Sequence, residues 1–426
     1  MPQTELKQSL DLSIQLHDPQ PLLYGGSIIL GHVVRKSSIV TPLATVLVRL
    51  LGRAKAEVTI NEGEYGSRQC RSCFNFWPDS AITEVIHEGP IQVAPSGSEN
   101  QSWAFTLALP THTDARSFDS FLGDSERKAC FLYPGGKVDS AAGIPEQLLP
   151  GSFFFGHDSG KEFHGLVEYW IEAELVVQGK GSIAKATLPI KVAVPPTLAP
   201  PISDFGLVKR EMSGSVSSQR LLPGMECAEL TFKQKTQKLF GSSKVPKFHY
   251  TLNVQYPTII QMGSNASIPF LLHISPDKES TTSVIKDVPQ TVTINNMQLE
   301  LHSITGIRCP GTPEPEEASK THKALLATIS SLYPANAQNI VNVVLPSGPE
   351  EEPLDLGAVL DLRLDDLGRV LHGTTMWRDY LGIKILPTFV SYCVRVEHLL
   401  RWDVCLSVAG ETWKCGGIQK ILVLRP

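Results

Sequence analysis

Residues 167–177 read VEYWIEAELVV, and this stretch decides the fold class. Apolar side chains at positions 167, 169, 171, 173, 175 and 177 alternate with glutamates at positions 168, 172 and 174. A period of two places one side of a β-strand on a hydrophobic core and the other side in water. Alternation of this kind is typical of antiparallel sheets with one solvated face. The stretch therefore predicts an all-β fold.

The same alternation recurs in both halves of the chain, over residues 10–16, 55–60, 103–109, 248–254 and 400–408. Between Val292 and Leu301 the apolar parity changes at Asn295-Asn296, which predicts a β-bulge or a bend. A helical spacing occurs over residues 320–332, where Leu325, Ile329 and Leu332 recur with a period near 3.6. We therefore expect strands throughout the chain and one short helix at residues 320–332.

The length and one proline-rich segment predict two domains. A chain of 426 residues is long enough for two domains of about 200 residues each. The run PPTLAPP at residues 195–201 cannot donate enough backbone hydrogen bonds for a central strand, so it predicts a stiff linker. We expect β-sandwich domains over residues 1–196 and 207–426, with the Pro-rich linker at 197–206.

The charge and the N-terminal sequence limit the classes of function. Lys and Arg number 38 against 43 Asp and Glu, so a net charge of −5 gives no general attraction to nucleic acid or to anionic membranes. The N-terminus lacks the basic start and apolar stretch of a secretory signal, and no apolar run is long enough to span a membrane. These features predict a soluble, cytoplasmic protein, in which the eight sparse cysteines are reduced.

Two short motifs match enzyme or cofactor sites only in spacing. Residues 179–184, GKGSIA, fit the dinucleotide fingerprint, but a strand-like segment with Pro189 follows in place of the required helix, which favours a hairpin turn. Cys70 and Cys73 have the spacing of half a zinc site, but no second pair completes the ligands, which favours buried or loop thiols. The sequence also lacks a nucleophile elbow and a phosphate-binding loop. We therefore expect no enzymatic activity, no metal site and no cofactor.

One cluster of basic residues stands out against the acidic balance of the chain. Between Thr231 and Tyr250 there is no acidic residue, and the lysines of this segment are Lys233, Lys235, Lys238, Lys244 and Lys247. They can be a solvated hairpin or a strand edge that lysines protect from aggregation. They can also be a binding site for phosphates, on a protein tail or on lipid headgroups.

Several segments occur in an order that resembles a known family. They are LSIQL (12–16) and YGGSIILGHVV (24–34), VLVRLLG (46–52), WAFTLALP (103–110), and LPGSF (149–153) followed by YWIEAEL (169–175). Together they resemble the arrestin family, in particular the α-arrestins and the arrestin-like proteins common in fungi. The resemblance is closer over residues 10–195 than over 248–424, and the stretch 112–165 is longer than the family has at that place.

The resemblance implies two curved immunoglobulin-like sandwiches joined by a short hinge. It implies a non-enzymatic adaptor or scaffold that binds cytosolic tails of membrane receptors or transporters in endocytosis, sorting or signalling, at the plasma membrane or endosomes. α-Arrestins dock HECT-type ubiquitin ligases through Pro-Pro-x-Tyr or Leu-Pro-x-Tyr motifs. Residues 195–198 and 200–203 lack the tyrosine, and residues 386–389, LPTF, come closest but lack its hydroxyl, so any ligase would be recruited indirectly. A retromer-type sorting subunit of arrestin fold and a β-sandwich enzyme stay open as alternatives.

Overall fold

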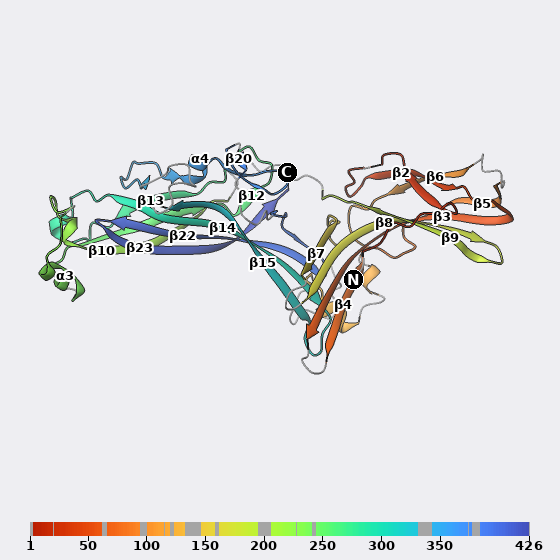
Figure 1. The fold of residues 1–426 in the computed structure, drawn as a ribbon, viewed down its shortest axis with the longest axis horizontal. Coiled ribbons are helices and arrows are strands. Elements are labelled where there is room, and N and C mark those ends of the chain that lie inside the picture. The colour runs from red at the N-terminus through yellow and green to blue at the C-terminus, as the bar shows by residue number, and fades with distance from the viewer. Residues whose placement is uncertain are drawn as a thin grey trace. The chain divides into compact units, whose positions relative to one another are not determined.

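The computed structural model describes most of the chain (Figure 1). The described residues are 3–19, 21–61, 66–93, 100–114, 116–119, 123–132, 146–157, 162–194, 206–226, 228–240, 244–330, 343–373, 375–376 and 384–425. The predicted linker at 197–206 lies outside them, apart from Gly206. None of the helices in these ranges has the length and apolar composition needed to cross a bilayer.

The chain forms two compact units. Unit 1 comprises Met1–Pro196, Thr305–Lys320 and Phe389–Val396, and unit 2 comprises Thr197–Ile304, Thr321–Thr388 and Glu397–Pro426. Most described residues of both units are in strands that pair antiparallel, so the all-β prediction is confirmed. The tandem division at the proline-rich segment stays a prediction, because that segment is not described.

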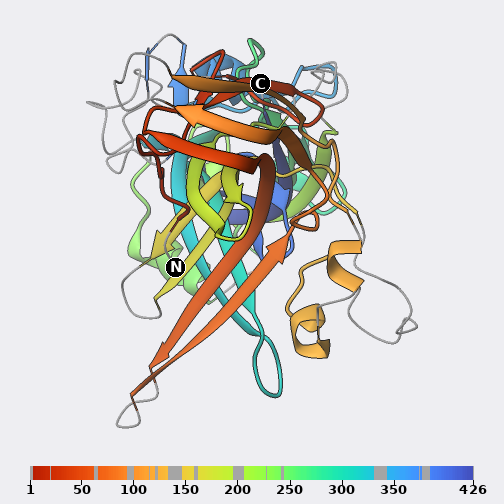
Figure 2. The same cartoon turned by 90° about the vertical axis from the view of Figure 1, so that its right-hand side faces the viewer.

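Unit 1 contains two sheets whose inner faces share one core. The elements are β1 (Ser13–Leu16), β2 (Ile28–Arg35), β3 (Ile39–Asn61), β4 (Ser67–Asn75), β5 (Thr83–Val93), β6 (Gln101–Ala108), α1 (Arg116–Asp119), α2 (Asp124–Lys128), β7 (Phe153–His157), β8 (Phe163–Val177) and β9 (Gly181–Ile190). The first sheet has the order β1-β2-β6. The second has the order β4-β3-β8-β7, with β5 on β3 and β9 on β8. Figure 2 shows the long strands β3 and β4, in red and orange, side by side.

Residues 167–177, VEYWIEAELVV, lie in β8. Their alternation decides which side chains of this strand enter the core of unit 1. The apolar residues at 167, 169, 171, 173, 175 and 177 are all buried, as predicted. Glu168, Glu172 and Glu174 lie on the other face of the same strand. The turn Gln178-Gly179-Lys180 then leads into β9, with Val177 opposite Gly181, so the predicted hairpin is confirmed. Gly179 and Gly181 have φ values of +81° and +72°, which favour glycine.

Unit 2 also has two main sheets on one core. The remaining strands of the chain are β10 (Val208–Ser217), β11 (Lys247–Tyr256), β12 (Ile259–Gln261), β13 (Leu271–Pro276), β14 (Val292–Cys309), β15 (Glu316–Ser330), β16 (Val343–Val344), β17 (Leu354–Asp355), β18 (Leu362–Leu364), β19 (Val370–His372), β20 (Thr375–Met376), β21 (Phe389–Val390), β22 (Val394–Val408) and β23 (Glu411–Leu424). Of these, β21 and the parts of β14, β15 and β22 that fall within Thr305–Lys320 and Phe389–Val396 belong to unit 1. The helices are η3 (Gln219–Leu221), α3 (Phe232–Leu239), η4 (Ser283–Ile285) and α4 (Leu356–Leu360). The sheet orders are β10-β11-β13-β17 and β12-β23-β22-β14-β15, and Trp402 is fully buried between their core residues.

The helix predicted at residues 320–332 is wrong. Residues 316–330 form strand β15, which pairs with β14. Ala324 and Leu326 are buried, whereas Leu325, on which the helical spacing depended, is only half-buried. A short apolar segment follows the period imposed by its sheet neighbour, because tertiary packing overrides a weak local preference. The buried positions of β14 change parity between Ile294 and Met297, as the sequence predicted.

Candidate anion-binding surface and charged sheet face

The predicted lysines belong to one long hairpin of unit 2. Strand β10 pairs antiparallel with β11, from Val208 opposite Tyr256 to Ser217 opposite Lys247. The connection between the two strands, residues 218–246, contains η3 and α3. Three of the lysines therefore lie in a helix within the hairpin connection and not on a strand.

Helix α3 begins with a capping box that the sequence analysis missed. The Thr231 Oγ1 accepts a hydrogen bond from the Gln234 backbone N at 3.4 Å, and the Gln234 Oε1 accepts one from the Thr231 backbone N at 2.8 Å. This reciprocal Thr-x-x-Gln arrangement satisfies donors that a helix start otherwise leaves open. No Gly or Pro interrupts residues 231–239. The motif was readable from the sequence and indicated a helix here.

The structure brings the five lysines to the same hairpin but not to one element. Lys233, which is exposed, Lys235 and Lys238 lie in α3. Lys244 is exposed in the connection, where its carbonyl oxygen accepts a hydrogen bond from Gln219 Nε2 at 3.2 Å. Lys247 is exposed at the first position of β11. Within the described part of the chain, neither Lys233 nor Lys247 has an ion-pair partner.

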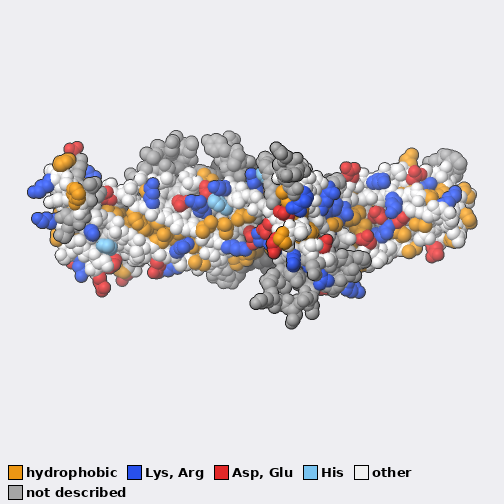
Figure 3. Space-filling view, turned by 90° about the horizontal axis from the view of Figure 1, so that it is seen from below, with side chains coloured by type: hydrophobic (Ala, Val, Ile, Leu, Met, Phe, Trp, Pro, Cys, Tyr) orange, Lys and Arg blue, Asp and Glu red, His pale blue; other side chains and the backbone are white. Residues whose placement is uncertain are grey.

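Helix α3 also presents an apolar stripe to solvent. Phe232, Thr236 and Phe240 follow one another at intervals of four residues, so they lie on one face of the helix. The Thr236 Oγ1 donates to the Phe232 carbonyl at 2.9 Å, and the Phe240 N donates to the Thr236 carbonyl at 3.1 Å. Phe232 is 87% exposed and Phe240 is 79% exposed. Figure 3 shows hydrophobic and basic side chains together at the end where Figure 1 places α3.

An acidic loop borders the start of β11. The backbone N of Lys247 donates to Thr282 Oγ1 at 2.9 Å, and the backbone N of Asp277 donates to the His249 carbonyl at 2.9 Å. Hydrogen bonds from the Ser280 side chain and backbone hold the pKa of Asp277 below its ordinary value. A negative charge therefore persists at this margin of the lysine segment.

A second polar surface, which the sequence analysis did not find, lies on the outer face of β3 and β8 in unit 1. Arg49 stands opposite Glu172, and their side chains pair at 2.9 Å. Arg49 also pairs with Glu174. Arg53 stands opposite Glu168, and its Nε donates to the carboxylate at 2.7 Å. We call this set of cross-strand charges the charged sheet face.

Glu168 of the charged sheet face has three partners. It accepts hydrogen bonds from the Thr4 backbone N at 2.7 Å and from Arg53, and it pairs with Lys55 at 3.1 Å. Burial raises the pKa of Glu168, but the hydrogen bonds from Thr4, Arg53 and Lys55 outweigh it, so the pKa lies below its ordinary value. The Arg53 guanidinium also stacks on the Trp170 ring, 4.6 Å from its centroid. The face is thus a set of fixed, ionised groups.

The cysteine pair does not converge on a site. Cys70 is buried and Cys73 is exposed, because residues three apart on β4 face opposite sides of the strand. Cys73 lies opposite Lys55 on the charged sheet face. Cys70 shares the core of unit 1 with Cys130, Cys309 and Cys393. Among the described residues, no group of three or more His, Cys, Asp or Glu is arranged to hold a metal.

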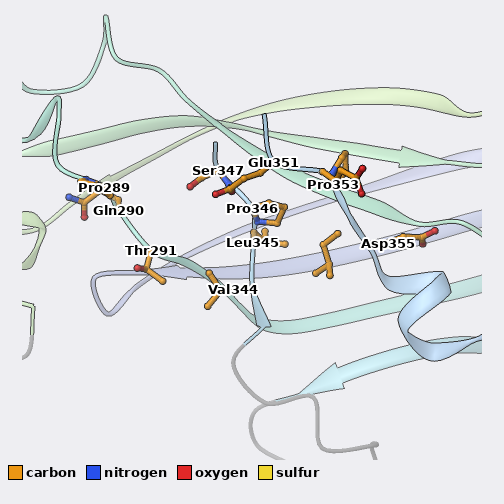
Figure 4. Close-up of a pocket in the computed structure, with 12 residues that line it drawn as sticks. Pro289, Gln290, Thr291, Val344, Leu345, Pro346, Ser347, Glu351, Pro353 and Asp355 are labelled. Carbon is orange, nitrogen blue, oxygen red and sulfur yellow. The ribbon is translucent and has the colours of Figure 1, made fainter. Parts of the chain in front are cut away.

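Unit 2 contains a cavity of about 510 Å³, lined by residues 289–291, 344–347 and 351–355 (Figure 4). The Glu351 carboxylate accepts hydrogen bonds from the backbone N of Ser347 at 2.7 Å and of Gly348 at 2.9 Å. These two bonds hold the pKa of Glu351 below its ordinary value. Asp355 Oδ1 accepts from the backbone N of Phe270 and of Ala358. The Glu351 carboxylate is therefore engaged in holding its own loop, and the Asp355 carboxylate caps α4 and joins it to the segment before β13.

Unit 1 contains a smaller cavity of about 400 Å³, lined by residues 3–4, 152–154, 167–169 and 189–191. It lies where the neighbour of β8 changes from β7, at Val167, to β9, at Tyr169. Glu168 of the charged sheet face is one of its lining residues. This cavity therefore adjoins the charged sheet face.

Comparison with known proteins adds no relative, because no protein-family model and no curated protein matches the chain.

Proposed function

We propose that the protein is a non-enzymatic adaptor of arrestin type that binds cytosolic tails of membrane receptors or transporters in endocytosis, sorting or signalling. Two observations support the proposal: residues 10–195 resemble the arrestin family, and the architecture is all-β. In this function the protein works in the cytoplasm and is recruited to the plasma membrane or to endosomes. A HECT-type ubiquitin ligase would join it only through another protein, because the chain contains no Pro-Pro-x-Tyr motif.

The observation that carries the proposal is the charged sheet face. Side chains on one face of a strand recur about every 6.6–6.8 Å, and those of an extended peptide recur at the same interval. Arg49 and Arg53, on one strand, can thus meet charged side chains of a tail that runs alongside them. Guanidinium groups suit this recognition because they bind carboxylate or phosphate through two parallel hydrogen bonds.

The existing ion pairs would make such binding selective. Arg49 and Arg53 are only about one quarter exposed, and Glu168 and Glu174 are less exposed still. An incoming acidic group with the right spacing shares a guanidinium group with the glutamate that already pairs with it. A tail without an acidic group covers the existing ion pairs and removes water from them without forming a new hydrogen bond, which is unfavourable.

The test uses synthetic peptides that cover the cytosolic tails of membrane proteins from the source cell. We expect the wild-type chain to bind a subset of these peptides and the R49Q/R53Q variant to lose at least tenfold in affinity, as expected for two charge-assisted hydrogen bonds. The control is R369Q/R401Q, which removes two arginines that form exposed ion pairs in unit 2. Tails that bind wild type and R49Q/R53Q equally would exclude the charged sheet face, and binding to no tail would exclude the adaptor function.

A further inference from the structure

We propose that α3 and its neighbouring lysines form a docking surface for an anionic lipid membrane. The surface, here called the α3 surface, consists of the exposed side chains of Phe232, Phe240, Lys233, Lys244 and Lys247. The sequence of α3 adds two further lysines, Lys235 and Lys238. The α3 surface goes beyond the proposed function, because its ligand is the bilayer itself and not a protein tail. It belongs to unit 2, whereas the charged sheet face belongs to unit 1.

The apolar part of the α3 surface is oriented away from the protein. An amphipathic helix on a globular protein normally turns its apolar stripe toward the core. Phe232 and Phe240 do the opposite, and Phe232 is the most exposed large hydrophobic side chain in the described ranges. At 1.5 Å per residue, the two rings are anchored about 12 Å apart along the helix axis. Two separated aromatic anchors on one stripe suit a helix that lies in the plane of a membrane interface.

The charged part of the α3 surface complements an anionic leaflet. The whole chain carries a net charge of −5 and would be repelled by such a leaflet, but residues 231–250 contain no acidic residue. Near an anionic membrane, each lysine strengthens binding by roughly fivefold. Lys233 is adjacent in sequence to Phe232, so charge and apolar anchor occur together at the start of α3.

The aromatic residues distinguish a membrane from a phosphorylated protein tail. Lysines alone serve both ligands, since they act as point charges toward any phosphate. A phosphate group gains nothing from Phe232 or Phe240, whereas an interface accommodates the rings beside the acyl chains and the ammonium groups among the headgroups. The combination of exposed rings and lysines therefore favours the membrane.

The experiment measures co-sedimentation of the full chain with vesicles. Vesicles of phosphatidylcholine alone are compared with vesicles that also contain about 30% phosphatidylserine, because only the latter supply the anionic field. We expect binding to the anionic vesicles, weakened as salt rises above about 0.15 M. We expect K233Q/K235Q/K238Q and F232S/F240S each to weaken it on the order of 100-fold, from about fivefold per lysine and tenfold per ring.

Matched variants remove the same chemistry elsewhere on unit 2. K209Q/K384Q/K414Q removes three exposed lysines, and V359S/L367S removes two exposed aliphatic side chains. Both controls should bind anionic vesicles within about twofold of wild type, because surface changes away from a site have small effects. Thermal unfolding of every variant verifies the fold, and the single variant F240S replaces F232S/F240S if the latter unfolds.

Three outcomes would overturn the proposal. The first is equal binding of wild type to neutral and anionic vesicles, and the second is equal loss in the controls. The third is a soluble peptide with two phosphoserines that binds wild type and F232S/F240S alike but not K233Q/K235Q/K238Q, which would assign the lysines to a phosphorylated tail. Failure here is distinguishable from failure of the adaptor function, because R49Q/R53Q should retain vesicle binding and the α3 variants should retain binding to tail peptides.

Discussion

Gly52 shows how a single residue fixes the core of unit 1. It stands directly opposite Tyr169, and a Cβ at this position would lie 2.6 Å from the tyrosine ring and 3.0 Å from Trp77. Neither ring is free to move away. Tyr169 donates to the Pro150 carbonyl at 2.6 Å, and Trp77 donates to the Leu50 carbonyl at 2.7 Å.

We expect Gly52→Ala to lower the free energy of unfolding by about 1–3 kcal/mol, because overpacking displaces side chains that are already hydrogen-bonded. Urea denaturation of the variant measures the change. The exposed Ser213→Ala in β10 serves as the control and should stay within about 0.5 kcal/mol. An unchanged midpoint for Gly52→Ala would mean that the core has room at this position.

The cysteines should differ in reactivity according to burial. Burial raises the pKa of Cys309 to about 12 and raises that of Cys393 well above its ordinary value, so both thiols are protonated and shielded. Partial burial raises the pKa of the Cys73 thiol as well, but this side chain is exposed on β4, so the reagent can reach it. In the native protein we expect iodoacetamide to label Cys73 well before Cys70, Cys309 or Cys393, as read by peptide mass spectrometry. Equal labelling of all four thiols before denaturation would contradict the burial seen in unit 1.

At the scale of elements, the pairing of β14 with β22 buries a titratable group. His398 is fully buried, with its Nδ1 3.0 Å from Ser303 Oγ. Burial lowers the pKa of His398 from 6.5 to about 4, against small opposing effects of the Leu386 carbonyl and Glu397. The unfolded chain therefore takes up a proton below pH 6.5, while the folded chain stays neutral until about pH 4. The contribution of neutral, buried His398 to the free energy of unfolding is therefore fully present above pH 6.5. It is lost progressively as the pH falls toward 4.

Protonation of His398 in the unfolded chain should lower the free energy of unfolding by about 2 kcal/mol between pH 7 and pH 5. This value follows because one pKa unit corresponds to about 1.36 kcal/mol. Denaturation at the two pH values measures the loss. Other groups also titrate in this range, so the informative quantity is the difference between wild type and His398→Gln. The variant should be less stable at pH 7 but less sensitive to pH. A pH dependence identical to that of wild type would show that His398 makes no contribution.

The elements also show what the sequence could and could not predict. Alternation identified the buried side of β8, because that signal depends only on local geometry. The helix predicted from the spacing of apolar residues at 320–332 was wrong, because pairing of β15 with β14 overrides that weak local preference. Helix α3 was not predicted, although the sequence contains its capping box at Thr231 and Gln234. The charged sheet face was beyond sequence reasoning, since a one-residue change in the register of β3 against β8 would separate Arg49 from Glu172.

At the scale of the whole molecule, the core of unit 1 includes residues far away in sequence. Ile307, Cys309, Ala318, Tyr392, Cys393 and Val394 are buried in the same cluster as the strands of residues 10–192. Tyr392 fixes this arrangement at two points. Its hydroxyl donates to Thr113 Oγ1 at 2.6 Å, and its carbonyl accepts from the Phe131 backbone N at 2.7 Å. Such contacts are invisible to a local pattern, because they depend on where a distant segment returns to the fold.

A fragment that ends at Pro196 should therefore be an incomplete form of unit 1. It lacks Ile307, Tyr392 and Val394, and each large apolar side chain removed from a core costs about 1.5–3 kcal/mol. We expect the fragment 1–196 to unfold at a lower urea concentration than unit 1 in the full chain and to bind the dye ANS, which reports exposed apolar surface. Tyr392→Phe in the full chain removes only the hydrogen bond to Thr113 and should cost about 1 kcal/mol. A fragment as stable as the intact unit would show that residues 305–320 and 389–396 cover the core of unit 1 without stabilising it.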